Sequence, residues 1–245
     1  MTVALAATIH DVEGRLAPAI ERQADALKAM FGGIALNITD TTAPAVVDAA
    51  RIHLGANIIR HRPGEAIIGR ARRDAVATAL DFDVPAILHC DFDHMLRWIA
   101  VGADGLRAVL AAQPDAGMLV VGRTAKAFAA DPARLRETER IVNHIYELMT
   151  GRAWDLMFAV RRLSRNCAEA IVREARVDTI ANDVEWPLLA ARAGFTLGYA
   201  EADGLYYRTM DEFGAAADAH DAEPREWIRR IEIATLHAEV LKSFL

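Results

Sequence analysis

Two aspartates that follow an apolar run are the residues of this chain best suited to chemistry. Asp91 and Asp93 come directly after a strand expected over residues 86–90. Residues i and i+2 of a strand project to the same side, so the two carboxylates are expected to converge on one point. Carboxylates that close repel each other unless a cation lies between them. The pair therefore predicts a divalent metal, Mn²⁺ or Mg²⁺, shared with the phosphates of a diphosphate substrate. A solvated turn after the strand is the alternative.

Five arginines gather within fourteen positions just ahead of the two aspartates. The planar guanidinium is well suited to binding phosphate, so some of them are expected to meet a phosphate group. The alternative is that they cover the exposed face of a helix. The residues are Arg60, Arg62, Arg70, Arg72 and Arg73.

The elements that must position these residues alternate along the first half of the chain. Apolar, β-rich runs predict strands, and apolar residues at helical spacing predict helices between them. This alternation is typical of a mostly parallel sheet flanked by helices, an α/β fold. The expected strands are 3–9, 34–39, 57–60, 86–90 and 118–121, and the expected helices are 16–31, 45–54, 69–80 and 96–112.

Ligands of such sheets bind at the carboxyl ends of the strands. Asp91 and Asp93 lie at one such end, and polar residues follow two other strands. His10 and Asp11 follow the first strand, and Asp40 follows the second. These residues are candidates for one binding crevice.

The second half of the chain has a different rhythm. Helices are expected up to Gly151, over 167–174 and over 186–193, and strands over 156–161, 196–199 and 205–208. A polar stretch over 214–223 reads as a linker, and the residues after it predict an amphipathic C-terminal helix. We expect one α/β domain with halves 1–125 and 126–213, followed by the linker and helix of 214–245.

Charge and composition limit the class of protein. The formal net charge is −6, which argues against a nucleic-acid-binding surface. No apolar run reaches the roughly 20 residues that a membrane-spanning helix needs. The two cysteines, Cys90 and Cys167, lie far apart and are expected to be packed, reduced thiols. We therefore expect a cytoplasmic protein without a transmembrane segment, and an oligomer is possible.

The order of several motifs resembles the GT-A fold glycosyltransferases, particularly the family 2-like group. Residues 71–79, Ala-Arg-Arg-Asp-Ala-Val-Ala-Thr-Ala, look like the family's A-R-N-x-G-[IL]-x-x-A helix. Residues 87–93, Ile-Leu-His-Cys-Asp-Phe-Asp, are similar to its strand leading into the D-x-D motif. Residues 182–194, which begin Asn-Asp-Val-Glu-Trp-Pro, look like its acidic motif and the helix after it. The resemblance covers roughly residues 3–210.

The resemblance implies transfer of a sugar, hexosyltransferase-like, from a nucleoside diphosphate sugar to an acceptor hydroxyl. The half 1–125 would bind the donor, and the half 126–213 would bind a small-molecule, glycan or lipid-linked acceptor. The usual P-x-[YF]-N after the first strand is here Thr8-Ile9-His10-Asp11. Arg72 would face the phosphates, with Arg70 or Arg73 as alternates. The implied donor-binding residues are Ile9, His10, Asp40, Arg70, Arg72, Arg73 and Asp91.

The resemblance also implies metal ligands and a base. Asp91 and Asp93 would hold the metal, with His220 as a third ligand chosen over His237. An inverting reaction, favoured over a retaining one, needs a carboxylate to take the acceptor proton. Asp183 is the first choice for that base and Glu185 the second; both residues could instead cap a helix.

Two other functions stay open at this point. A non-catalytic nucleotide-binding protein would keep the sheet without turnover, and the departures at residues 8–11 and at Arg73 favour it. A phosphatase of the haloacid dehalogenase type also uses a strand-terminal D-x-D, but that motif normally ends the first strand of its core. Here three strands are expected before it, so this alternative ranks lower.

Overall fold

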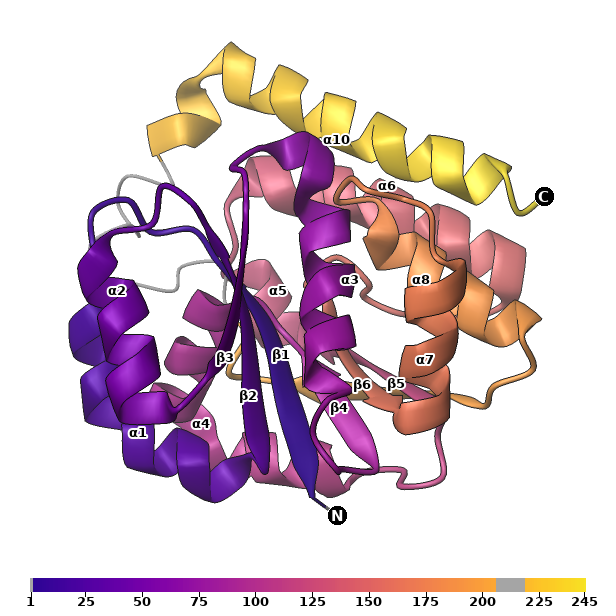
Figure 1. Cartoon of the computed structure of the whole chain (residues 1–245). Helices are drawn as coiled ribbons and strands as arrows, with labels where there is room; N and C mark the ends of the chain where they lie inside the picture. Colours follow the sequence, from indigo (N-terminus) through magenta and orange to yellow (C-terminus); the bar gives the residue numbers. More distant parts are fainter. Residues whose placement is uncertain (1, 206–218) are drawn as a thin grey trace.

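One seven-stranded sheet forms the centre of the computed structural model, which describes residues 2–205 and 219–245 (Figure 1). Its strand order is β3-β2-β1-β4-β6-β5-β7. β6 pairs antiparallel with both of its neighbours, whereas every other pairing is parallel. The predicted α/β class with a mostly parallel sheet is confirmed. The strands are β1 (Val3–Ile9), β2 (Gly33–Thr39), β3 (Asn57–His61), β4 (Ala86–His89), β5 (Met118–Arg123), β6 (Val160–Ser164) and β7 (Leu197–Ala202).

Helices cover both faces of the sheet because the central strands are apolar on both sides. In β1, Leu5 and Ala7 pack into one core with α1 and α4, and Ala4 and Ala6 pack into a second core with α3. The second core continues to α7, α8 and the C-terminal helix. The helices of the first half are α1 (Ala17–Met30), α2 (Pro44–Ala49), the π-helix η1 (Ala50–Leu54), the 3₁₀-helix η2 (Glu65–Ile67), α3 (Ile68–Ala79) and α4 (Phe92–Ala111).

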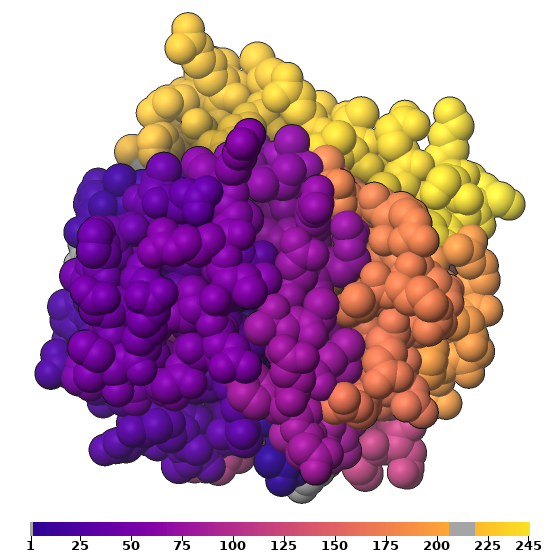
Figure 2. Space-filling view, in the orientation of Figure 1, coloured from indigo at the N-terminus to yellow at the C-terminus, as the bar shows by residue number. Residues whose placement is uncertain are grey.

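The second half adds helices to one face and closes on the C-terminal helix. The amphipathic helix predicted there is α10, and it lies across α6 and α8 (Figure 1). Figure 2 shows this segment in yellow against segments coloured purple and orange. The helices are α5 (Ala125–Ala129), α6 (Ala133–Thr150), α7 (Arg165–Glu174), α8 (Asn182–Arg192), the 3₁₀-helix η3 (His220–Ala222) and α10 (Pro224–Lys242).

Several expectations about elements need correction. α4 begins at Phe92 and not at residue 96, and α8 begins at Asn182 and not at residue 186, so Asp183 and Glu185 lie inside that helix. The strand expected over 156–161 begins at Val160, because the preceding residues turn and Ala159 has a positive φ of 56°. The strand before the two aspartates ends at His89, and Asp91 is the N-cap of α4. Residues 206–208 of an expected strand and 214–218 of the expected linker lie outside the described residues.

The strand directions decide where a ligand can bind. β4 and β5 both run antiparallel to β6, so they are parallel to each other. The carboxyl ends of β1, β2, β4 and β5 therefore share one edge of the sheet. No helix within the described residues is long and apolar enough to cross a membrane.

Candidate functional site

A cavity of about 290 Å³ opens where β1 and β4 end. It combines the segment that follows β1 with the first turn of α4, as expected for the crevice of such a sheet. The structure thus brings Ile9 and His10 together with Asp91 and Asp93, as the sequence predicts. The lining residues are Thr8, Ile9, His10, Asp11, Arg15, Leu16, Ile68, Asp91, Asp93 and His94.

Asp91 is held at the floor of this cavity by two neighbours. Thr8 Oγ1 donates to Asp91 Oδ1 over 2.7 Å, and Arg72 Nη2 donates to Oδ2 over 2.7 Å. Arg72 Nε adds a longer bond of 3.3 Å to Oδ1. Burial alone would raise the pKa of Asp91, but the charge and hydrogen bonds of Arg72 outweigh it and hold that pKa well below its usual range. Asp91 is therefore a fixed carboxylate that already has a cationic partner.

Arg72 joins Asp91 to a second carboxylate on another helix. Its Nη1 donates to Asp183 Oδ1 over 2.9 Å and to Asn182 Oδ1 over 3.1 Å. Burial would lower the pKa of Arg72, but the charges of Asp91 and Asp183 raise it above its ordinary value. One buried guanidinium, from α3, thus ties the end of β4 to the start of α8.

The C-terminal helix reaches the same group of charges. The Nε2 atom of His237, on α10, lies 3.7 Å from Asp183 Oδ2. His237 is fully buried, and its Nδ1 lies 2.8 Å from the carbonyl oxygen of Ile233. From the sequence, His237 was a candidate only for a metal ligand. The structure places it against Asp183 instead.

Asp93 and His94 lie in the first turn of α4 and not on a strand. The expected i, i+2 geometry is therefore wrong, although Asp91 and Asp93 still line the same cavity. His94 Nδ1 is buried and makes no hydrogen bond within the part of the chain that the structure describes. A carboxylate and an imidazole nitrogen without a partner fit a divalent cation whose other ligands come from phosphates and water. They do not form a complete protein cage.

Of the other residues predicted to bind the donor, His10 lines the cavity and three do not. His10 Nδ1 lies 3.0 Å from Thr39 Oγ1 at the cavity wall. Asp40, Arg70 and Arg73 do not line this cavity. Arg70 is exposed beside Asp74 at 3.8 Å, and Arg73 binds Asp178 at 2.8 Å. Of the three candidate arginines, Arg72 alone has a described contact with Asp91.

Both candidates for the general base are buried. Asp183 is 2% exposed and Glu185 is 4% exposed. Glu185 Oε1 accepts hydrogen bonds from the backbone N–H groups of Arg176 and Val177, at 2.7 Å and 3.0 Å. Glu185 thereby holds the loop before α8, and Asp183 holds Arg72.

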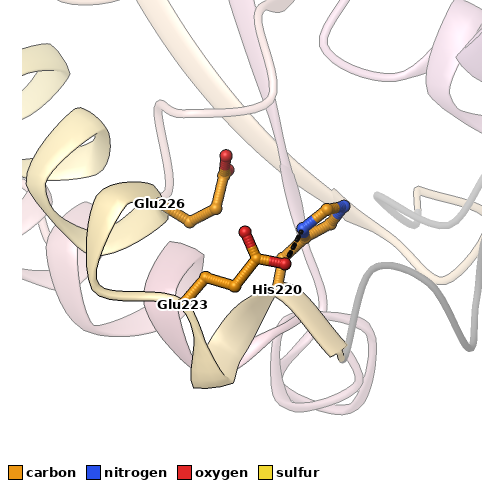
Figure 3. A group of neighbouring side chains, drawn as sticks. All are labelled: His220, Glu223 and Glu226. Carbon is orange, nitrogen blue, oxygen red and sulfur yellow. Dashed lines mark hydrogen bonds and ion pairs between the residues drawn. The ribbon is translucent and has the colours of Figure 1, made fainter.

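His220 belongs to a different cluster from the two aspartates. Figure 3 shows it beside Glu223 and Glu226 at the start of α10. Ligand atoms of these three residues lie within 4.8 Å of one another, and His220 Nδ1 lies 3.2 Å from Glu223 Oε1. His220 does not line the cavity of Asp91 and Asp93.

Sequence reasoning missed several residues of the site, including Thr8, Asn182 and Ile68. Thr8 lies inside β1, Asn182 begins α8, and Ile68 begins α3. Thr8 carried a weak signal, since it is a polar residue at the end of an apolar strand. The contact of Asn182 with Arg72 spans 110 positions, and no local pattern encodes it.

Comparison with solved structures gives the same fold. Glucosyl-3-phosphoglycerate synthase of Mycobacterium tuberculosis superposes with a TM-score of 0.55 at 11% identity, over 94% of this chain and 80% of that one. A complex of that enzyme with Mg²⁺ and uridine diphosphate gives 0.51 at 12% identity, over 95% and 79%. Its complex with Mn²⁺, uridine diphosphate and phosphoglyceric acid gives 0.51 at 13%, over 95% and 78%. This chain therefore has the GT-A glycosyltransferase fold, as predicted.

Sequence comparisons assign no family. No family model matches the chain. Two uncharacterized ABC transporter ATP-binding proteins from strains of Mycobacterium tuberculosis are 42% identical over 79 residues. That stretch is 29% of this chain and 24% of each relative, so the chain spans about a quarter of their length. A likeness this partial says nothing about the activity of the whole chain.

Proposed function

We propose that this protein is a metal-dependent glycosyltransferase that moves a sugar from a nucleoside diphosphate sugar to a hydroxyl of a small-molecule acceptor. The observation that carries the proposal is the cavity at the ends of β1 and β4, which holds Asp91, Asp93 and His94 on a sheet of the GT-A type. Solved neighbours of this fold contain uridine diphosphate with Mg²⁺ or Mn²⁺. Those ligands support the proposal for this chain by analogy of fold.

Each residue of the cavity would have a different role in binding the metal and the donor. Asp93 and His94 would hold Mn²⁺ or Mg²⁺ together with the donor phosphates. When bound, the cation would supply Lewis-acid stabilisation of the charge on the leaving diphosphate. Arg72 keeps Asp91 ionised and fixed in place, while its own positive charge offsets that of the carboxylate. Ile9 and His10 would line the path of the nucleotide.

The acid–base step of an inverting reaction stays a prediction. Asp183 reaches the cavity only through Arg72, and one of its oxygens faces His237. A base needs a lone pair within hydrogen-bond reach of the acceptor hydroxyl. Asp183 would therefore have to part from Arg72 or His237 before taking a proton. Glu185 would have to leave two backbone amides.

A nucleotide-binding protein without turnover is the second candidate function. The burial of Asp183 and Glu185 favours it, since neither carboxylate is open to an acceptor. This candidate predicts the same metal-dependent nucleotide binding and no release of nucleoside diphosphate from a donor. Cytoplasmic location and oligomeric state stay predictions under either function.

Calorimetric titration with uridine diphosphate tests the proposal. We expect binding with MnCl₂ present, loss of binding with a chelator, and at least a tenfold weaker affinity for Asp93→Asn. Asp104→Asn is the matched control, because Asp104 lies on the same helix and pairs only with exposed Arg107 in the contacts described. Uridine diphosphate binding that is equally strong with MnCl₂ and with a chelator would rule out the proposed metal site. Release of uridine diphosphate from UDP-sugars then separates the transferase from the binding protein.

A further inference from the structure

A second and larger cavity adjoins the first. Its volume is about 460 Å³, within the range of small-molecule sites. It lies between α10, the start of α6, the loop before α8 and the segment η2–α3. Ile68, the first residue of α3, lines both cavities and separates them. Figure 1 shows the start of α3 directly below α10.

The walls of this second cavity are mainly apolar. Leu135 of α6, Ile180 of the loop and Ile233 of α10 contribute side chains, and Leu236 adds a half-exposed one. With Ile68, these residues come from four segments that lie far apart in the sequence. An apolar cavity of this size is favourable for hydrocarbon, because filling it removes apolar surface from water.

The charged residues at the cavity have partners within the protein. Arg134 binds Asp221 at 2.9 Å, Arg230 binds Glu139 at 2.7 Å, and Arg229 pairs with Glu65. A charged ligand would have to break one of these pairs. The cavity therefore suits an uncharged apolar group.

We propose that this second cavity, defined by Ile68, Leu135, Ile180 and Ile233, binds the hydrocarbon portion of an acceptor alcohol. The inference rests on the proposed function, since the alcohol end of that acceptor would pass Ile68 towards the cavity of Asp91 and Asp93. The acceptor would thus be amphiphilic, with an apolar body and a reactive hydroxyl.

Ligand-detected NMR with a series of straight-chain alcohols tests this site. The probes are n-butanol, n-hexanol and n-octanol, each titrated against the full chain. We expect affinity to rise about fourfold per added methylene until the cavity is full. We also expect n-octanol and uridine diphosphate with Mn²⁺ to bind together, because the two cavities are adjacent and separate. An affinity that does not change with the length of the alcohol, or competition between n-octanol and uridine diphosphate with Mn²⁺, would overturn the inference.

Two tryptophan substitutions on α10 give the matched comparison. Ile233→Trp puts a larger side chain at the cavity wall and is expected to weaken n-octanol binding at least tenfold. Ile231→Trp changes an exposed residue of the same helix that does not line the cavity, and is expected to stay within twofold of wild type. Equal affinities for the two variants would count against the cavity as the site of binding.

The result can be told apart from a failure of the proposed function. Binding of uridine diphosphate with Mn²⁺ is measured on the same samples and is expected to be unchanged by either tryptophan. Alcohol binding without nucleotide binding would refute the transferase proposal and leave an apolar binding site. Nucleotide binding without alcohol binding would refute the inference alone.

Discussion

At the scale of single residues, one arginine organises the charges of the candidate site. Arg72 is buried and touches both Asp91 and Asp183, which come from segments 92 positions apart (183 − 91). Two carboxylates that share one guanidinium, one buried and one partly buried, would repel each other without it. The arginine therefore stabilises the fold and sets the charge of the cavity at the same time.

Replacing Arg72 tests this role. Arg72→Met leaves the buried carboxylate of Asp183 and the partly buried carboxylate of Asp91 without their cation, which is expected to lower the free energy of unfolding by about 3–5 kcal/mol. Arg70→Met is the control, since Arg70 is exposed on the same helix and pairs with Asp74 at 3.8 Å, and is expected to cost less than about 1 kcal/mol. Urea unfolding of both variants measures the difference. Similar losses would show that the buried pairs contribute no more than a surface pair.

Arg123, the last residue of β5, makes a comparable contact with Asp155, and the stabilisation that this contact provides depends on pH. Arg123 donates to both oxygens of Asp155, over 2.7 Å and 2.8 Å. Burial would raise the pKa of Asp155, but the hydrogen bonds and charge of Arg123 lower it below the ordinary 3.8. A lowered pKa in the folded state stabilises the protein above the unfolded pKa, and this stabilisation is lost as the pH falls through the folded value.

The stability of Asp155→Asn, compared with wild type at several pH values, tests that sign. We expect the wild type to be more stable than Asp155→Asn at pH 6, where Asp155 is ionised in both the folded and the unfolded state. The difference in the free energy of unfolding is expected to narrow as the pH falls below about 4. Urea unfolding at each pH provides the free energies. A gap that stays constant or widens on acidification would mean that Arg123 does not depress this pKa.

At the scale of elements, a glycine allows α3 to approach the loop before α8. A Cβ at Gly69 would lie 2.2 Å from the carbonyl oxygen of Thr179, and Gly69 N donates to the carbonyl of Asp178 over 2.8 Å. This approach brings Arg72, one turn further along α3, within reach of Asp183. The glycine is thus required by the packing of two elements and not by a turn.

Gly69→Ala is expected to separate the two segments. The added methyl must push backbone atoms apart, at a cost of about 1–3 kcal/mol, and is expected to weaken nucleotide binding by displacing Arg72. Gly105→Ala is the control: Gly105 is an exposed residue of α4 whose added Cβ would lie 3.9 Å from its nearest neighbour, so the change is expected to be neutral or stabilising. Thermal unfolding with and without uridine diphosphate and Mn²⁺ measures both effects. Equal melting temperatures for the two variants would contradict this packing argument.

At the scale of the whole molecule, the sequence predicts local elements better than their partners. The alternation of strands and helices follows from apolar periodicity, and so does α10. The antiparallel insertion of β6 between β4 and β5 does not, because strand direction depends on contacts between segments about 40 to 80 positions apart. The irregular residues before Val160, with Ala159 at a positive φ, shifted the start of that strand.

In the candidate site, too, the sequence predicts some residues from local patterns and misses those that depend on packing between segments. Asp91 and Asp93 stand out because both follow an apolar strand, and the segment with Ile9 and His10 follows another strand of the same sheet. Asp183 binds Arg72 because of the way α3 and α8 pack. A sequence motif that predicts a general base carries no information on this packing, so it cannot reveal that Asp183 is buried. His220 was chosen for its place in a polar stretch near the C-terminus and not by a motif, and it lies beside Glu223 and Glu226 instead.

Anomalous diffraction from crystals grown with MnCl₂ and uridine diphosphate tests the central claim most directly. The account predicts a manganese peak in the cavity at the ends of β1 and β4, in contact with Asp93 and with the diphosphate. A peak only at His220, Glu223 and Glu226, or a bound nucleotide with no manganese beside Asp93, would contradict it.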